Sequence, residues 1–167
     1  AIRAVKRVYR ELSGDDRELE PKDIFDIAEG ATEGNSVAAK EAFATLGRVA
    51  GDAMATAVTL MDGVIVIGGG LSAASKYFMP ALLDEMRSKI RTMSGDELQR
   101  VQMNVYNLDD ETEFKKFASG NSTKIKVYGT DLEVVYDPEK RVGVTISDIG
   151  ASNAVSLGAY LYAIDNI

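Results

Sequence analysis

The segment with the clearest chemical potential is a run of glycines that follows a short aliphatic stretch. Gly68, Gly69 and Gly70 come directly after residues 64–67, which are all valine or isoleucine. Glycine has no side chain, so a ligand can approach its backbone closely. In open α/β sheets, ligands bind outside the carboxyl ends of the strands. The run therefore predicts a place where an adenine ring or a ribose phosphate rests on exposed backbone.

The glycine run has other interpretations. A tight turn from strand to helix can require glycine for its positive φ alone. The run is not a P-loop, because no Gly-Lys-Ser/Thr follows it. Gly68, Gly70 and Ala73 match a loose G-x-G-x-x-A pattern of dinucleotide-binding folds. However, the acidic residue expected about 20 residues later is not clearly placed, since Asp84 and Glu85 fall within a predicted helix.

Other polar residues are weaker candidates for chemistry. An acidic cluster could hold a metal, but acidic residues also favour the first turn of a helix, and we favour that interpretation for Asp109, Asp110, Glu111 and Glu113. Asp148 precedes the last predicted helix and could contact a nucleotide or magnesium, or simply form a turn. Packing rather than base stacking is expected of Tyr106, Tyr128 and Tyr136. No two residues form a credible nucleophile and base, so we predict no catalytic residue and no metal ligand.

The composition excludes several classes of protein. The 167 residues suit one domain, and they include no cysteine and no histidine. Disulfides, zinc sites built on these residues and His-based catalysis are therefore excluded. The formal charge is −7, and no run of Lys and Arg suggests a nucleic-acid-binding surface. No stretch approaches the roughly 20 apolar residues of a membrane span. We expect a cytoplasmic protein that contacts neither nucleic acid nor membrane.

Helical and extended patterns alternate along the chain. Hydrophobic periodicity predicts helices at 1–12, 21–30, 36–61, 75–91 and 109–117, and a last helix capped by Ser152 or Asn153. Strands are predicted at 64–67, 101–105, 124–128, 131–136 and 141–147. The strand at 64–67 is expected to be buried on both faces, as in a parallel sheet. The many small residues of helix 36–61 predict close packing against a sheet, a helix or another subunit. The alternation predicts a largely parallel α/β layer.

The segment from Asp62 to Ser72, with the sequence DGVIVIGGGLS, resembles the strand and adenosine motif of the ROK family. This family of repressors and sugar kinases belongs to the actin/hexokinase/Hsp70 superfamily. The alanine-rich helix before the motif is also similar to the family, as is the small-residue stretch 154–159 in the last helix. The resemblance covers most of residues 1–95 and 142–165.

The resemblance implies a ribonuclease-H-like fold of the actin/hexokinase type. Residues 1–167 would form a single C-terminal, nucleotide-binding lobe with flanking helices and a β-hairpin insertion within 98–141. The complete protein would bind ATP and Mg²⁺ and would form a homo-oligomer. The residues that the resemblance places beside the adenosine are Gly68, Gly69, Gly70, Leu71 and Ser72.

The chain lacks other family motifs, namely the phosphate loop, the Asn-Asp catalytic motif and the His and Cys residues that bind zinc. The resemblance therefore implies the C-terminal portion of a longer protein that phosphorylates a hexose such as glucose, and a chain that is inactive alone. Two alternatives stay open. The chain could be the effector-binding part of a ROK transcriptional repressor, or a Rossmann-like dinucleotide-binding domain.

Overall fold

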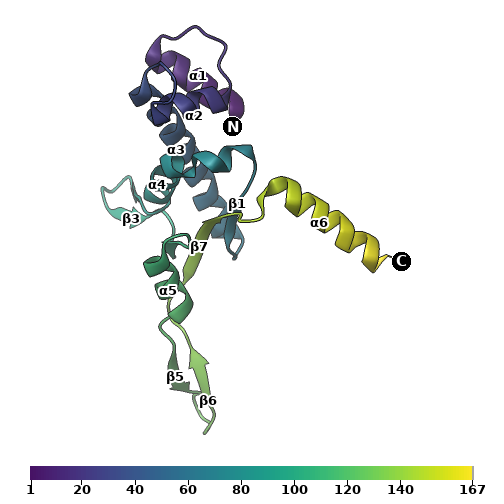
Figure 1. Cartoon of the computed structure of the whole chain (residues 1–167). Helices are drawn as coiled ribbons and strands as arrows, with labels where there is room; N and C mark the ends of the chain where they lie inside the picture. Colours follow the sequence, from purple (N-terminus) through teal and green to yellow (C-terminus); the bar gives the residue numbers. More distant parts are fainter. Residues whose placement is uncertain (167) are drawn as a thin grey trace.

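The computed structural model describes residues 1–166 and contains one central sheet, two small hairpins and several helices (Figure 1). The helices are α1 (Ile2–Ser13), α2 (Pro21–Glu29), α3 (Ser36–Leu60), the 3-10 helix η1 (Gly70–Ala74), α4 (Ser75–Met86), α5 (Glu111–Ser119) and α6 (Gly150–Asp165). The strands are β1 (Ile65–Ile67), β2 (Lys89–Arg91), β3 (Glu97–Gln99), β4 (Asn104–Asn107), β5 (Thr123–Lys126), β6 (Glu133–Tyr136) and β7 (Arg141–Ile146).

The central sheet is parallel and has the strand order β1-β7-β4. Residues 65–67 of β1 lie in register with 144–146 of β7, and 104–107 of β4 lie in register with 141–144. Val142 and Val144 are buried, so the middle strand contributes most to the core. These features confirm the predicted α/β class with a parallel sheet.

The aliphatic strand before the glycines is not buried on both faces, contrary to our prediction. β1 lies at an edge of the sheet. Ile65 and Ile67 pack against the core, whereas Val66 between them is 61% exposed. Successive side chains of a strand point to opposite faces, so Val66 lies on a face of the sheet that is largely open to solvent. A continuous aliphatic run therefore indicated the strand but not its burial.

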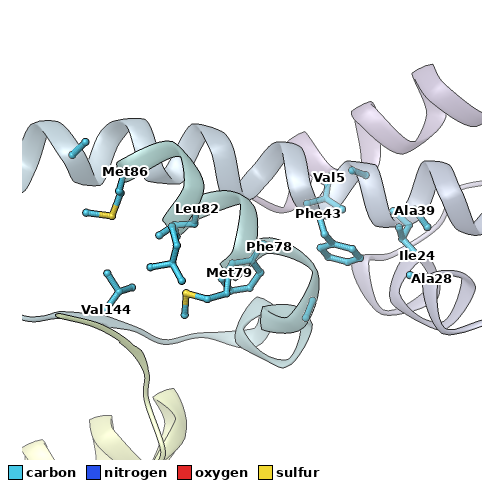
Figure 2. Close-up of a cluster of buried hydrophobic side chains, with 14 of the residues drawn as sticks. Val5, Ile24, Ala28, Ala39, Phe43, Phe78, Met79, Leu82, Met86 and Val144 are labelled. Carbon is cyan, nitrogen blue, oxygen red and sulfur yellow. The ribbon is translucent and has the colours of Figure 1, made fainter. Parts of the chain in front are cut away.

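The longest helix, α3, connects the two halves of the core (Figure 2). At one end Phe43 packs among buried residues of α1 and α2, including Val5 and Ile24. Along the rest of α3 lies α4, whose Leu82 and Met86 point toward Val144 of the sheet. The small residues of α3 thus serve close packing against a neighbouring helix, which is one of the predicted alternatives.

A polar cluster fastens the loop between α1 and α2. The side chain of Tyr9 is buried, and its hydroxyl donates to Asp15 Oδ2 at 3.2 Å and accepts from the Asn35 N–H at 3.3 Å. Arg17 donates to both oxygens of Asp15, at 2.5 to 3.0 Å. The Arg17 guanidinium thereby holds the pKa of Asp15 well below its usual range.

Replacing Asp15 should change the acid stability of the chain. A carboxyl whose pKa is lowered by folding contributes stability above its unfolded pKa of about 3.9, and the contribution is lost as the pH falls through the folded pKa. Asp15→Asn should therefore lower the melting temperature above pH 5, and the difference from wild type should shrink below about pH 4. Thermal unfolding from pH 7 to pH 2 measures this. The exposed neighbour Asp16 provides the control Asp16→Asn. A constant Asp15→Asn difference at every pH would contradict the prediction.

Several predicted boundaries differ from the structure. The strand predicted at 101–105 lies at 104–107, and the helix predicted at 109–117 begins two residues later, at Glu111. The helix predicted at 75–91 ends at Met86, and residues 89–91 form β2, which pairs with β3 in an antiparallel hairpin. Ile90 continued the helical spacing of Leu82, Leu83 and Met86, but its side chain is exposed on β2. The last helix begins at Gly150 with no side-chain cap, so neither Ser152 nor Asn153 caps it.

The segment 98–141 is not wholly separate from the core. It contains β4, which pairs with β7 in the central sheet. The hairpin of β5 and β6, joined by a turn at Gly129 and Thr130, projects from the opposite end of the molecule to α1 and α2 (Figure 1). Helix α6 extends away from the body, and its apolar residues, such as Val155 at 71%, are exposed. No helix in the described part of the chain has the length and apolar character of a membrane span.

Candidate functional site at the glycine turn

The glycine turn lies at the carboxyl end of β1, where the strand passes into η1 and then α4. The Ile67 carbonyl accepts from the Ser147 N–H of the neighbouring strand end at 2.8 Å. Gly69 has a φ of 103°, a conformation that favours glycine. Its carbonyl accepts from the Ser72 N–H at 3.0 Å and from the Ser72 hydroxyl at 2.7 Å. These bonds fix the turn, so part of the glycine run is explained by backbone geometry alone.

The other two glycines do not have this explanation. Gly68 and Gly70 are exposed and have no φ in the left-handed region. A Cβ on Gly70 would meet nothing within 4 Å, and one on Gly68 would meet only the Ser147 Cβ at 3.7 Å. Side chains could therefore be accommodated at both positions as far as this chain is concerned. Their absence leaves the backbone open to a ligand.

A hollow of about 520 Å³ opens beside this turn. Its floor is the strand end and the glycine turn, and its walls come from α3 and α4 and from the first residues of α1 and α2. The lining side chains are apolar except for one hydroxyl: Ala1, Ile2, Pro21, Leu46, Ala50, Met54, Ile67, Leu71, Ser72, Phe78 and Leu82, together with the three glycines. The structure thus brings Gly68, Gly69, Gly70, Leu71 and Ser72 to one apolar hollow.

Sequence reasoning missed the α3 wall of this hollow. The spacing of Leu46 and Ala50 indicated one apolar face of a helix, and a core-facing stripe was the simplest interpretation. Both residues, with Met54 one turn later, also line the hollow. Periodicity identifies which face is apolar but not whether another part of the chain covers it. No signal in the sequence alone could have distinguished a pocket wall from a core.

A larger hollow of about 840 Å³ lies between β4, α5 and the β2–β3 hairpin. Three charged residues line it, and two of them, Arg87 and Glu113, make their hydrogen bonds within the chain; the third is Lys116. Arg87 donates twice to the Val105 carbonyl, at 2.8 and 3.0 Å, and once to Glu113 at 2.5 Å. These contacts join α4, β4 and α5. We therefore assign this hollow a structural role and place the candidate site at the glycine turn.

The acidic cluster is divided among separate structural contacts. Asp110 caps α5 by accepting from the Glu113 N–H at 2.8 Å. Glu113 accepts from the Asn107 N–H at 2.7 Å and from Arg87. Asp109 accepts from the Thr145 hydroxyl at 2.6 Å and from the Ile146 N–H at 3.2 Å. Among residues 1–166, no three acidic side chains gather where they could hold a metal ion.

Asp109 joins the carboxyl ends of β4 and β7, so its removal should weaken the sheet. Asp109→Ala should lower the free energy of unfolding by about 1 kcal/mol, the usual net value of such hydrogen bonds. Denaturant unfolding measures this. The control is Glu111→Ala, because Glu111 is 82% exposed and pairs with Lys115 one turn away. Millimolar Mg²⁺ should change neither result. Stabilisation of the wild type by Mg²⁺, lost in Asp109→Ala, would instead show a metal site.

The remaining candidates lie in three different places. Tyr106 donates to Glu139 at 2.5 Å and packs edge-on against Phe117, and the hydrogen bond to Glu139 raises the pKa of its hydroxyl. Tyr128 and Tyr136 belong to the projecting hairpin and are exposed, so the expected packing is present only for Tyr106. Asp148 is exposed next to Ser147 at the same edge of the sheet as the glycine turn. A contact between Asp148 and a ligand stays a prediction.

Comparison with known proteins agrees with the arrangement of strand, glycine turn and helix. The model of the ROK family matches residues 1–111. A glucokinase from Parabacteroides distasonis is 51% identical to this chain in sequence, and its crystal structure superimposes on the chain with a TM-score of 0.86. The match covers 99% of this chain and 44% of the glucokinase chain, so this chain spans less than half of the length of that glucokinase. No curated protein matches the chain. Because the family model matches more than half of its residues, the chain belongs to the ROK family.

Proposed function

We propose that this chain is the nucleotide-binding part of a ROK-type sugar kinase that transfers the γ-phosphoryl group of ATP to a hexose such as glucose. The observation that carries the proposal is the apolar hollow at the glycine turn. There the backbone of Gly68 and Gly70 is accessible to a ligand. An adenine ring could lie against Leu46, Ala50 and Phe78, with its ribose near the glycines. The similarity of this chain to a glucokinase supports the choice of a hexose as the phosphoryl acceptor.

The chain would contribute binding and orientation rather than the chemical step. Phosphoryl transfer requires groups that clamp the phosphates and a base that accepts the hydroxyl proton. The hollow is lined by no charged side chain, so these groups would belong to the rest of the complete protein. Mg²⁺ neutralises phosphate charge in such reactions, but among residues 1–166 no three acidic side chains gather to hold it, and we assign it no ligand here.

A carboxylate at the hollow would have favoured a different class of nucleotide. Dinucleotide-binding folds place an Asp or Glu on the ribose 2′-hydroxyl of NAD. No acidic side chain lines the hollow beside Gly68–Gly70. We therefore favour ATP over a dinucleotide. The choice between a kinase and the effector-binding part of a repressor depends on activity, and the oligomeric state and cytoplasmic location stay predictions.

The proposal is tested with the complete protein and with this chain side by side. The complete protein should convert ATP to ADP in the presence of Mg²⁺ and a hexose, as measured by a coupled assay over a panel of sugars. This chain should bind ATP in calorimetry but produce no ADP. Binding of a sugar without ADP formation would indicate a repressor, and binding of NAD without ATP would indicate a dinucleotide domain. Failure of the complete protein to bind ATP would refute the proposal.

A further inference from the structure

The lining of the hollow at the glycine turn carries an inference about which nucleotides it accepts, and the inference rests on the proposed function. Of the side chains that form the hollow, only Ser72 has a polar atom. Its hydroxyl donates to the Gly69 carbonyl at 2.7 Å, so the proton is not available to a ligand and only the oxygen lone pairs can accept from one. A base in the hollow would therefore meet hydrocarbon walls from α3 and α4, the first residues of α1 and α2, and the backbone of the turn.

Such a lining cannot strongly distinguish adenine from guanine. The two bases differ at C6, where adenine carries an amino donor and guanine a carbonyl acceptor, and at C2, where only guanine has an amino group. Rejection of the wrong base by a factor of about 10⁴ requires a polar group of the site that the wrong base leaves unpaired. Apolar walls have no such group. The exposed glycines offer both N–H and C=O groups, so either base can find a partner.

The same reasoning applies to the sugar of the nucleotide. In dinucleotide-binding folds a carboxylate recognises the ribose by accepting a hydrogen bond from its 2′-hydroxyl. No side chain that lines this hollow has a carboxylate. A 2′-deoxyribose therefore leaves no group of this chain unpaired. The size of the base does matter, because a two-ring base covers more of the walls formed by Leu46, Ala50 and Phe78 than a one-ring base does.

We propose that the site accepts purine nucleoside triphosphates as a class, reading the base by shape rather than by its hydrogen-bonding edge. ATP, GTP and dATP should bind within about tenfold of one another, and CTP should bind more weakly than all three. The hydroxyl of Ser72 should not set this pattern. Ser72→Ala removes a bond that holds the turn and can weaken all the nucleotides, but the ratio of the ATP and GTP dissociation constants should change less than about threefold.

The experiment is competition of each unlabelled nucleotide against a fluorescent ATP analogue bound to the complete protein, with Mg²⁺ present throughout. Dissociation constants for ATP, GTP and dATP within tenfold, with weaker CTP, would support the inference. ATP binding with GTP or dATP more than tenfold weaker would overturn the inference but leave the proposed function intact. Equal binding of CTP and ATP would also overturn it, because the base would not lie on the apolar walls. If no nucleotide displaced the probe and none bound directly, the proposed function itself would fail.

Discussion

Gly47→Ala should destabilise this chain severely, although alanine is the better helix former. Gly47 lies on the face of α3 that packs against α4, and a Cβ there would sit 2.2 Å from the Phe78 carbonyl oxygen. The obstacle is backbone inside a helix, which cannot rotate away as a side chain could. The two helices would have to separate, and overpacking of this kind costs about 3 kcal/mol, against a gain of about 1 kcal/mol in helix propensity. We expect a net loss of about 2 kcal/mol and a melting temperature about 5 °C lower.

The matched control for this variant is Gly158→Ala. Gly158 is also inside a helix, α6, but a Cβ there would meet nothing within 4 Å. That substitution should raise the stability of α6 by up to about 1 kcal/mol, because only the propensity term applies. Gly51→Ala provides a second test on α3, since its Cβ would lie 2.5 Å from the Leu82 carbonyl oxygen. Thermal and denaturant unfolding of the three variants measures these changes in stability. Equal changes in Gly47→Ala and Gly158→Ala would contradict close packing of α3 against α4.

These helix positions illustrate what the sequence could predict. The small residues of α3 indicated that another backbone approaches closely, and the structure shows that Gly47 and Gly51 face α4. The sequence could not identify the partner, because a small side chain indicates that something packs closely against it but not which element does so. The same limit applies to Val66, whose type is suited to a buried strand although it lies on the uncovered face of an edge strand. Residue type and local pattern are properties of a short segment, whereas burial depends on what the whole fold brings to that segment.

The glycine turn could likewise be predicted only in part. Its position at the carboxyl end of a parallel strand followed from the local sequence, since the aliphatic run and the glycines are contiguous. The apolar walls did not follow, because α3 and α4 are brought together over the turn only by tertiary packing. The hairpin of β2 and β3 was missed for a related reason. Ile90 fits a helical period as well as a strand period, and the pairing of 89–91 with 97–99 decides between them.

Gly70→Val should weaken ATP binding at least tenfold without unfolding the chain. Gly70 begins η1, has no left-handed φ and has open space where a side chain would project. Because a Cβ at Gly70 meets no atom within 4 Å, we expect the added isopropyl group to fit without a clash within the protein. It would instead project beside the backbone that an adenosine has to approach. Gly69 is less informative, because its φ of 103° makes any side chain strained whether or not a ligand binds.

Gly63→Val is the control at the other end of the same strand. Gly63 likewise has no left-handed φ and no atom within 4 Å of its Cβ position, but it does not line the hollow. Both variants should keep the melting temperature of the wild type within about 2 °C, since surface substitutions change stability by at most about 0.5 kcal/mol. Only Gly70→Val should lose affinity for ATP in calorimetry with the complete protein. Equal ATP affinity of the two variants would mean that the nucleotide does not rest on the glycine turn. Equal loss in both would point to a general effect on the strand, so the difference between the variants is what measures contact at Gly70.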